Sequence, residues 1–186
     1  MRGLAILGFV GGFCLAAPAL AGGFDFGFAR PGMAEAELRA AYDNPGIKVV
    51  CTSDSESLPS AIAQALAVDP VLAGRGVARC RHLKRTDKGG WKAIEVKLWD
   101  VCCADLFVTL APEAKDRRVA RINARAPAAA FMPLMVHFAV EYGPYDSFTD
   151  NVAIWHRDGQ TAYLLSRDSA AILQIEADSL DAQLRQ

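Results

Sequence analysis

Apolar and polar residues alternate along several stretches of this 186-residue chain, and each such stretch predicts a half-buried β-strand. The alternation is clear in residues 91–99, where every second residue from position 94 is apolar. In residues 151–166, two such runs flank Asp158-Gly159, a pair typical of a two-residue hairpin turn. Further strands are predicted at residues 47–53, 76–85, 102–111, 118–126 and 170–177.

A period of three to four residues between apolar positions marks the predicted helices. The clearest helix spans residues 130–142 and ends at Gly143, a residue common after helix C-termini. A short helix is predicted at residues 34–42, where two early acids suit the positive end of the helix dipole. Another is predicted within residues 56–70, and the tail from residue 178 is either a short helix or frayed.

The order of these elements, helix then strands and again helix then strands, predicts the α+β class. We expect an antiparallel sheet with the helices packed on one face and with disulfides as staples. Residues 22–186 are expected to form a single domain. A duplicated helix-then-strands unit would divide it into residues 22–126 and 127–186, whereas a continuous sheet would take both helices against it. The pattern leaves both arrangements open.

The N-terminal segment has the three parts of a secretory signal peptide. Arg2 is basic, residues 3–17 are apolar or glycine, and a small-x-small triplet ends at Ala21. We therefore expect cleavage of residues 1–21 and a periplasmic or secreted protein with no stable membrane insertion. The net charge of the whole chain is −1, which gives no basis for nucleic acid or an anionic membrane as the main partner.

Four cysteines remain after the expected cleavage, and an even number in an exported chain indicates disulfides. Cys102 and Cys103 are adjacent in a predicted strand, so their side chains should point to opposite faces. We favour bonds from Cys51 and Cys80 to these two neighbours, in either order. The alternative joins Cys51 to Cys80 across the inserted helix and leaves the neighbours as a vicinal bond or as free thiols.

Other chemistry of these cysteines has less support in the sequence. A redox site would need a Cys-x-x-Cys helix start, which the chain lacks. Cys80-x-His82 together with Cys102 and Cys103 offers four soft zinc ligands, but no reverse turn separates the first two. We therefore expect neither a metal nor a cofactor.

Catalytic residues are also hard to find in this sequence. None of the three histidines, His82, His137 and His156, lies near a nucleophile motif such as Gly-x-Ser-x-Gly. Glycine-rich phosphate loops after a strand are missing as well. We predict that the protein is not an enzyme.

Two stretches are candidate binding surfaces. Arg79 and Arg81 share one strand face and Arg121 and Arg125 share another, so adjoining strands would give a local cationic patch. The simpler interpretation is a solvated face that protects an edge strand against aggregation. The second candidate is the loop that follows the main helix, residues 142–148, because it contains three aromatic residues.

The motifs "PGMAEAEL" and "EYGPYDSF", the second followed by "VAIW", resemble those of small bacterial envelope domains. Gly32, Met33 and Glu37 match a helix-opening pattern of the small outer-membrane-assembly lipoproteins and the related β-lactamase-inhibitor-like fold. The resemblance implies two helix-plus-sheet units that bind proteins without catalysis. The chain departs from the family in lacking a lipoprotein cysteine and in the helix inserted after Cys51, and we carry over no binding residues.

Three functional hypotheses follow. The first is a non-catalytic domain that binds another envelope or exported protein. The second is an anionic small-ligand binder that uses Arg79, Arg81, Arg121 and Arg125. The third is a thiol-redox protein centred on the adjacent cysteines.

Overall fold

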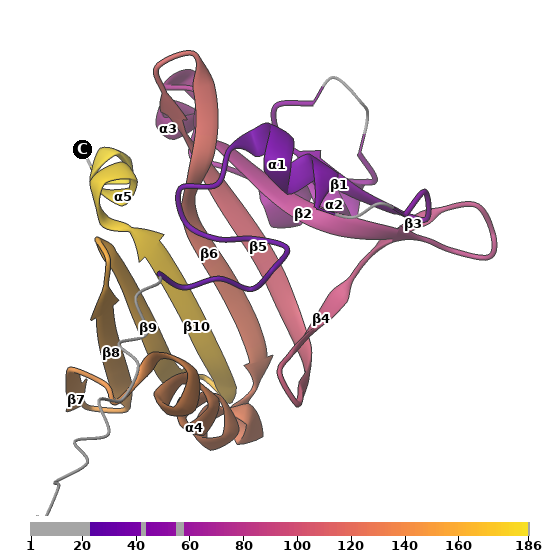
Figure 1. Cartoon of the computed structure of the whole chain (residues 1–186). Helices are drawn as coiled ribbons and strands as arrows, with labels where there is room; N and C mark the ends of the chain where they lie inside the picture. The colour runs from indigo at the N-terminus through magenta and orange to yellow at the C-terminus, as the bar shows by residue number, and fades with distance from the viewer. Residues whose placement is uncertain (1–22, 42–43, 55–57, 186) are drawn as a thin grey trace, which may run out of the picture.

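The computed structural model describes residues 23–41, 44–54 and 58–185, and its centre is one ten-stranded antiparallel sheet (Figure 1). Eight strands run in the order β1-β2-β5-β6-β10-β9-β8-β7, while β3 pairs with β2 and β4 with β5. The predicted signal peptide lies outside the described residues. The strands are β1 (Ile47–Cys51), β2 (Ala78–Arg85), β3 (Trp91–Ala93), β4 (Glu95–Leu98), β5 (Val101–Glu113), β6 (Asp116–Pro127), β7 (Ser147–Thr149), β8 (Val152–Arg157), β9 (Gln160–Arg167) and β10 (Ala170–Ala177).

Five α-helices pack beside this sheet, so the predicted α+β class with an antiparallel sheet is confirmed. The tail that was expected to be short helix or frayed chain is helical over most of its length. Within the described ranges, we find no helix with the length and apolar character needed to cross a bilayer. The helices are α1 (Glu35–Ala40), α2 (Ser60–Leu66), α3 (Pro70–Gly74), α4 (Phe131–Tyr142) and α5 (Asp178–Leu184), with a short 3-10 helix, η1 (Ala128–Ala130).

Helices cover parts of both faces of the sheet, whereas one face was expected. Leu38 of α1 joins the same core cluster as Val49, while Leu66 of α2 packs with Val50. Val49 and Val50 are neighbours in β1, and neighbouring side chains of a strand point to opposite faces. Figure 1 shows α1 and α4 together in front of the sheet. The first strand is therefore buried on both sides.

The last four strands form a meander because each connection is a two-residue turn. Asp158 and Gly159 have φ of +48° and +71°, and Arg157 pairs with Gln160 across them. Two-residue hairpin turns with positive φ at both positions match the twist of the flanking strands, which explains the Asp-Gly pair. The predicted hairpin is thus confirmed, and the same geometry occurs at Asp150-Asn151 and Asp168-Ser169.

One continuous sheet includes the strands of both halves of the domain. After β6 the chain crosses in α4 to the far edge, and the meander then returns until β10 pairs with β6. Of the two arrangements that the sequence left open, this is the continuous sheet with both predicted helices against it. The described residues on either side of position 126 consequently share a sheet and a core.

An aromatic cluster joins α4 to the rest of the core. The ring centroid of Phe138 lies 5.1 Å from that of Trp155 in β8 and 5.2 Å from that of Trp99. Phe24, from the segment before α1, lies 4.9 Å from the ring of Tyr142 and is fully buried. Edge-to-face and tilted contacts of this kind add to the free energy of burial itself. Phe24, in the described segment before α1, is therefore an integral part of the core.

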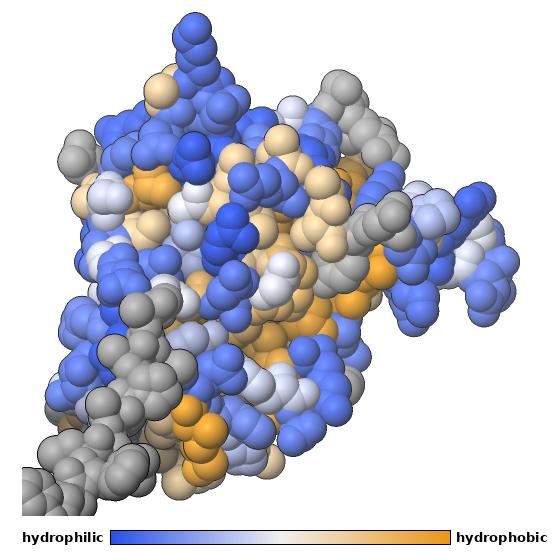
Figure 2. Space-filling model, in the orientation of Figure 1, coloured by the Kyte–Doolittle hydropathy of each residue, from blue (hydrophilic) through white to orange (hydrophobic). Residues whose placement is uncertain are grey.

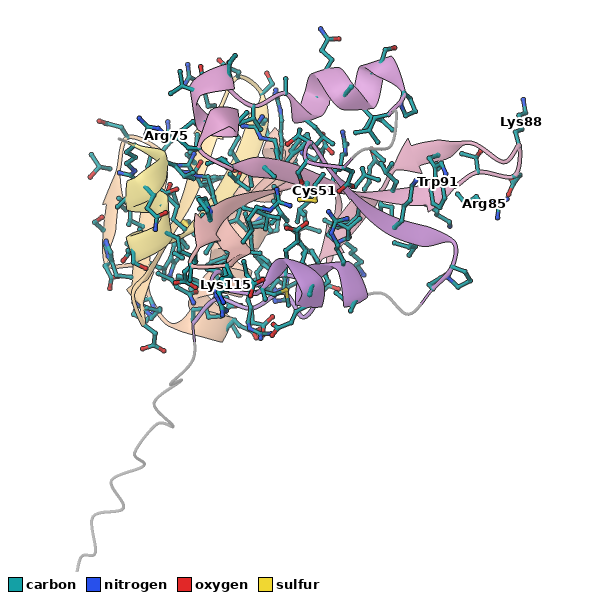
Figure 3. All side chains as sticks on the ribbon, turned by 90° about the horizontal axis from the view of Figure 1, so that it is seen from above. Cys51, Arg75, Arg85, Lys88, Trp91 and Lys115 are labelled. Carbon is teal, nitrogen blue, oxygen red and sulfur yellow. A yellow bond between two sulfur atoms is a disulfide. The ribbon has the colours of Figure 1, made fainter. Side chains whose placement is uncertain are left out.

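The sheet divides between β2 and β5. Residues 78–80 of β2 pair with β5, but residues 83–85 pair with β3, and β4 pairs with the first half of β5. The predicted strand 91–99 therefore changes partner at Ile94, whose backbone N–H donates a hydrogen bond to the carbonyl oxygen of His82 (3.1 Å). Figure 3 shows the resulting β2–β3 hairpin, with Arg85 and Lys88, projecting from the body of the protein.

His82 lies at this division and is buried, with 2% of its surface exposed. Its ring makes an edge-to-face contact with Phe28, at a centroid distance of 5.6 Å. Burial disfavours the charged imidazolium, which lowers the pKa of His82 to about 4. The side chain is therefore neutral at pH 7.

A disulfide joins Cys51 to Cys80, which face each other directly in β1 and β2. The favoured pairing of these two cysteines with Cys102 and Cys103 is therefore wrong, and the alternative pairing is the one found. The reason is register, because the strand that follows α2 and α3 returns antiparallel beside β1 and sets the two sulfurs side by side. The side chains of Cys102 and Cys103 lie outside the described residues.

We predict that replacing both Cys51 and Cys80 by Ala lowers the free energy of unfolding by about 2–4 kcal/mol, because the unfolded chain regains the entropy of a closed loop. The bridged residues are 29 positions apart. Urea unfolding of the variant, and of the reduced wild type as control, measures the loss. A change below about 0.5 kcal/mol in both would contradict the prediction.

We also predict that the fold loses stability in acid through His82. Its pKa is lowered from 6.5 to about 4, so the contribution is fully present above pH 6.5 and declines as the pH falls toward 4. The loss is up to about 3 kcal/mol, from the free-energy value of each pKa unit. His82→Gln should flatten the dependence of unfolding free energy on pH in this range, as urea unfolding at a series of pH values measures.

Candidate binding surfaces

The four arginines predicted to form a patch lie on one face of the sheet. Arg79 in β2 pairs in register with Thr109 of β5, and Thr109 pairs with Arg121 in β6, so both side chains extend from the same side of the two strands that flank β5. Arg81 and Arg125 are two and four residues further along β2 and β6, on that same side. The patch was predicted on the condition that these two strands adjoin, but β5 lies between them. The charges of Arg81 and Arg121, however, are neutralised by acids of the same chain.

Arg81 is neutralised within the sheet. Its guanidinium forms an ion pair with Asp105 of β5, and only 12% of the arginine side chain is exposed. The guanidinium carbon also lies 4.7 Å from the ring centroid of Phe107, a cation–π distance. This arginine holds β2 to β5 beside the division of the sheet, and it presents little charge to solvent.

Arg121 is neutralised by two buried acids, Glu176 in β10 and Asp181 in α5. Its Nη2 lies 2.6 Å from Asp181 and its Nε lies 3.3 Å from Glu176. Both carboxylates are about 2% exposed, and Arg185 forms ion pairs with the same two groups. Burial, and then the nearby charge of Asp181, raise the pKa of Glu176. The cluster fastens α5 to the sheet.

Arg79 and Arg125 remain as the less constrained members of the patch. Nη1 of Arg79 donates a hydrogen bond to the carbonyl oxygen of Ala67 (3.1 Å). Burial, with the nearby charge of Arg121 as a second cause, lowers the pKa of Arg79. Arg125 is exposed, and within the part of the chain that the structure describes it has no ion pair. Only two of the four predicted cations thus face solvent without a carboxylate partner there.

The predicted aromatic loop is partly a closure of the core and partly surface. Tyr142 is buried against Phe24, whereas Tyr145 and Phe148 are 45% and 46% exposed. The two exposed rings lie 5.8 Å apart. Asp146 accepts hydrogen bonds from the His156 backbone and from Arg157, and the backbone bond is the main cause of its lowered pKa. The loop is therefore held in one conformation while presenting two aromatic rings.

A further surface that the sequence interpretation missed lies on α4. The helix buries Leu134, Phe138 and Tyr142, yet three large apolar residues on its other side are exposed. The exposed fractions are 55% for Met132, 56% for Val136 and 76% for Val140. These residues are spaced by four, so they form one stripe along the outside of the helix. Figure 2 shows apolar surface at the position that α4 occupies in Figure 1.

The exposed rings of Tyr145 and Phe148 follow in the segment after α4, which ends at Tyr142. We call Met132, Val136 and Val140 with Tyr145 and Phe148 the α4 surface. A sequence signal for it existed in residues 131–142, where apolar residues occupy nearly every side of the helix. A helix that is apolar on all sides is normally buried on all sides.

The histidines do not converge on one another. His137 stacks on Trp99 with a centroid distance of 5.8 Å, His156 contacts Asp146 at 3.2 Å, and His82 is buried at the division of the sheet. Glu35, Cys51 and Asp54 form a group with metal-ligand spacing. The Cys51 sulfur is bonded to Cys80, however, and Arg39 pairs with both carboxylates, so these groups are already engaged.

Comparison of the chain with protein-family models, with curated proteins and with solved structures gave no match. The resemblance to small outer-membrane-assembly lipoproteins therefore stays a prediction from the motifs of residues 31–38 and 141–148.

Arg121 and Arg125 should respond differently to substitution. Arg121→Met leaves two buried carboxylates with Arg185 as their nearest cation, and we expect it to lower the free energy of unfolding by about 3 kcal/mol. Arg125→Met removes the same charge from an exposed position and should change it by less than about 0.5 kcal/mol. Chemical denaturation of the two variants tests this, and equal effects would contradict the assignment.

Proposed function

We propose that this chain is an exported, non-catalytic domain that binds another envelope or exported protein through the α4 surface. The observation that carries the proposal is the exposed stripe of Met132, Val136 and Val140 on a helix whose opposite side is fully buried. Large apolar side chains grouped on one surface mark interaction sites, because leaving them in water forfeits the free energy of burial.

The chemistry of the α4 surface favours a protein partner over a lipid surface. Helix α4 contains no Lys or Arg, and its charged or titratable residues are His137, Glu141 and the buried Tyr142. Helices that bind anionic membranes carry lysine and arginine on their polar side. Exposed aromatic rings such as those of Tyr145 and Phe148 are in turn typical of the centres of protein interfaces. The expected partner therefore offers an apolar groove or patch.

The Cys51–Cys80 disulfide supports the exported location, because such bonds persist in oxidising compartments. A periplasmic or secreted protein is accordingly our proposal, with residues 1–21 as the signal peptide. The patch of four arginines is a weaker candidate, because Arg81 and Arg121 are neutralised by acids of the same chain.

A photo-crosslinking amino acid at position 136 tests the proposal in cells that export the full chain. We expect a covalent adduct with one other protein, and we expect Val140→Lys to reduce its yield at least fivefold. Val71 is 63% exposed on α3 and serves as the matched position for both the crosslinker and the lysine. Because all these side chains are exposed, the thermal stability of the variants should match that of the wild type.

Two outcomes would contradict the proposal. The first is the same set of adducts from positions 71 and 136, which would show only random collision. The second is an adduct of position 136 whose mass is twice that of the chain, because the occupant would then be a second copy and not another protein.

A further inference from the structure

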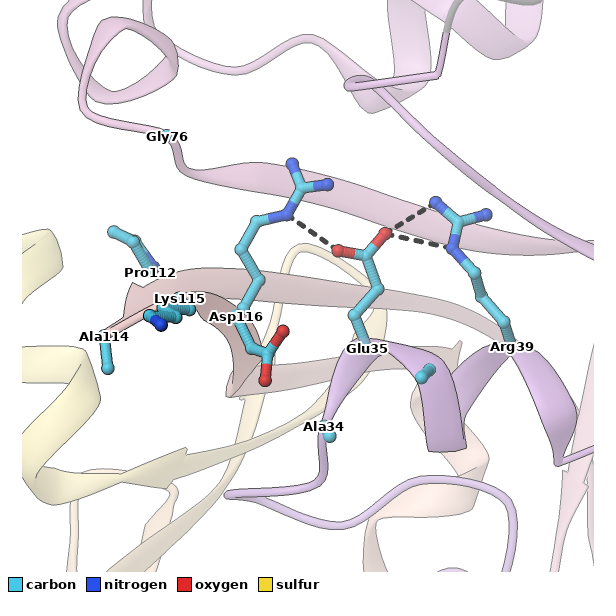
Figure 4. Close-up of a pocket in the computed structure, with 10 residues that line it drawn as sticks. Ala34, Glu35, Arg39, Gly76, Pro112, Ala114, Lys115 and Asp116 are labelled. Carbon is cyan, nitrogen blue, oxygen red and sulfur yellow. Dashed lines mark hydrogen bonds and ion pairs between the residues drawn. The ribbon is translucent and has the colours of Figure 1, made fainter.

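Three cavities meet around the connection between α3 and β2. The largest has a volume of about 560 Å³ and is lined by α1, Gly76 and the β5–β6 turn (Figure 4). A second, of about 200 Å³, shares Gly76 and Arg117 with it, and a third, of about 470 Å³, shares Pro112. Gly76 has a φ of +87°, a conformation that favours glycine. We call the first two cavities the Arg117 cleft.

Arg117 lines both cavities of the cleft, and a hydrogen bond from one of its nitrogens fixes the orientation of its side chain. Its Nε donates a hydrogen bond to Oε2 of Glu35 (2.7 Å), while the other oxygen of Glu35 accepts from Arg39. Figure 4 shows Glu35 between the two guanidiniums. For the Nη atoms of Arg117, we find no hydrogen bond or ion pair within the described ranges, and 28% of this side chain is exposed. The guanidinium therefore keeps two nitrogens able to bind an anion.

Other cations border the same space. Lys115 lines the large cavity, whereas Arg75 lines the third, neighbouring cavity and directly precedes Gly76 of the cleft, and both are exposed. Neither forms an ion pair with any residue that the structure describes. Asp116 is the one acid of the large cavity besides Glu35, and Glu35 is already neutralised by Arg39 and Arg117. Arg39 also pairs with Asp54, so the charges of Glu35, Asp54 and Asp116 balance those of Arg39, Arg117 and Lys115. Arg75 then adds one positive charge beside the opening.

The remaining walls combine hydroxyl groups with small apolar side chains. Thr52 and Ser53, from the segment after β1, line the smaller cavity. The apolar part of the lining consists of Ala34, Ala36, Val68, Ala73, Val77, Pro112 and Ala114. Sites for small molecules commonly have this composition, with mostly apolar walls and a few polar groups that fix orientation, at volumes of about 300–1,000 Å³.

We propose that the Arg117 cleft is a binding site for a small organic anion, with a carboxylate or phosphate group on an apolar body. The anionic group is held by the Nη atoms of Arg117, which match two oxygens in a fork geometry, and by the charge of Lys115 and Arg75. The apolar body lies against the alanine and proline side of the large cavity. This site is separate from the α4 surface and does not depend on the protein-binding proposal.

Titration of the disulfide-bonded protein with phenyl phosphate, followed by NMR of backbone amides, tests the site. We expect saturable shifts at residues 75–77 and 115–117, and no such shifts with benzyl alcohol, which has a similar apolar body and no charge. Replacing Arg75 and Lys115 together by Gln should weaken binding at least tenfold. The matched control replaces Arg85 and Lys88 by Gln, which removes the same charge from the projecting hairpin.

The control variant should bind as the wild type does. Equal weakening in both double variants would overturn the proposal, because general attraction to a cationic protein would then explain the shifts. Shifts that do not saturate, or that fall outside the Arg117 cleft, would also overturn it. Arg75 and Lys115 are exposed and unpaired in the described chain, so their replacement should leave the fold intact, and the amide spectrum itself verifies this.

Discussion

The burial of Phe138 connects parts of the chain that are far apart in sequence. Its ring contacts Phe24 before α1, Trp99 between β4 and β5, and Trp155 in β8. Hydrogen bonds accompany this packing, since the Tyr142 hydroxyl donates to the carbonyl oxygen of Asp25 and Nε1 of Trp99 donates to Glu141. Packing and side-chain hydrogen bonds together set the position of the helix over the sheet. Each aromatic contact contributes about 0.5–1.5 kcal/mol beyond simple burial. The outward direction of the exposed stripe on α4 follows from this inward anchor.

The cations of the described chain fall into two groups with different roles. Arg39, Arg81 and Arg121 pair with acids and join elements of the fold to one another. Lys115 and Arg75, in contrast, extend from turns and form no ion pair with any acid of the described chain. A near-neutral total therefore conceals two populations of cations, one that stabilises the fold and one that is available to an external anion.

Local patterns predicted local structure well, because turns and helix ends depend on neighbouring residues. Asp158-Gly159 and the helix end at Gly143 are cases of this kind. Long-range pairing was harder, since nothing near Cys51 or Cys80 indicates which strand lies beside β1. The α3 helix was missed although Asp69 caps it, because it spans only five residues. The Arg117 cleft depends on a close approach of α1 and β6, which no single stretch of sequence records.

The meander of two-residue turns has a consequence for how the chain folds. Within the described chain, strands β7, β8 and β9 pair only with their neighbours in sequence, and hairpins of this kind form within about 1–10 μs. Pairing of β10 with β6 instead closes a loop that contains α4 and three strands. Because loop closure slows the formation of distant contacts, the C-terminal third of the chain is expected to be ordered before the sheet is complete. The newly made meander would then be the template on which the earlier-synthesised strands assemble.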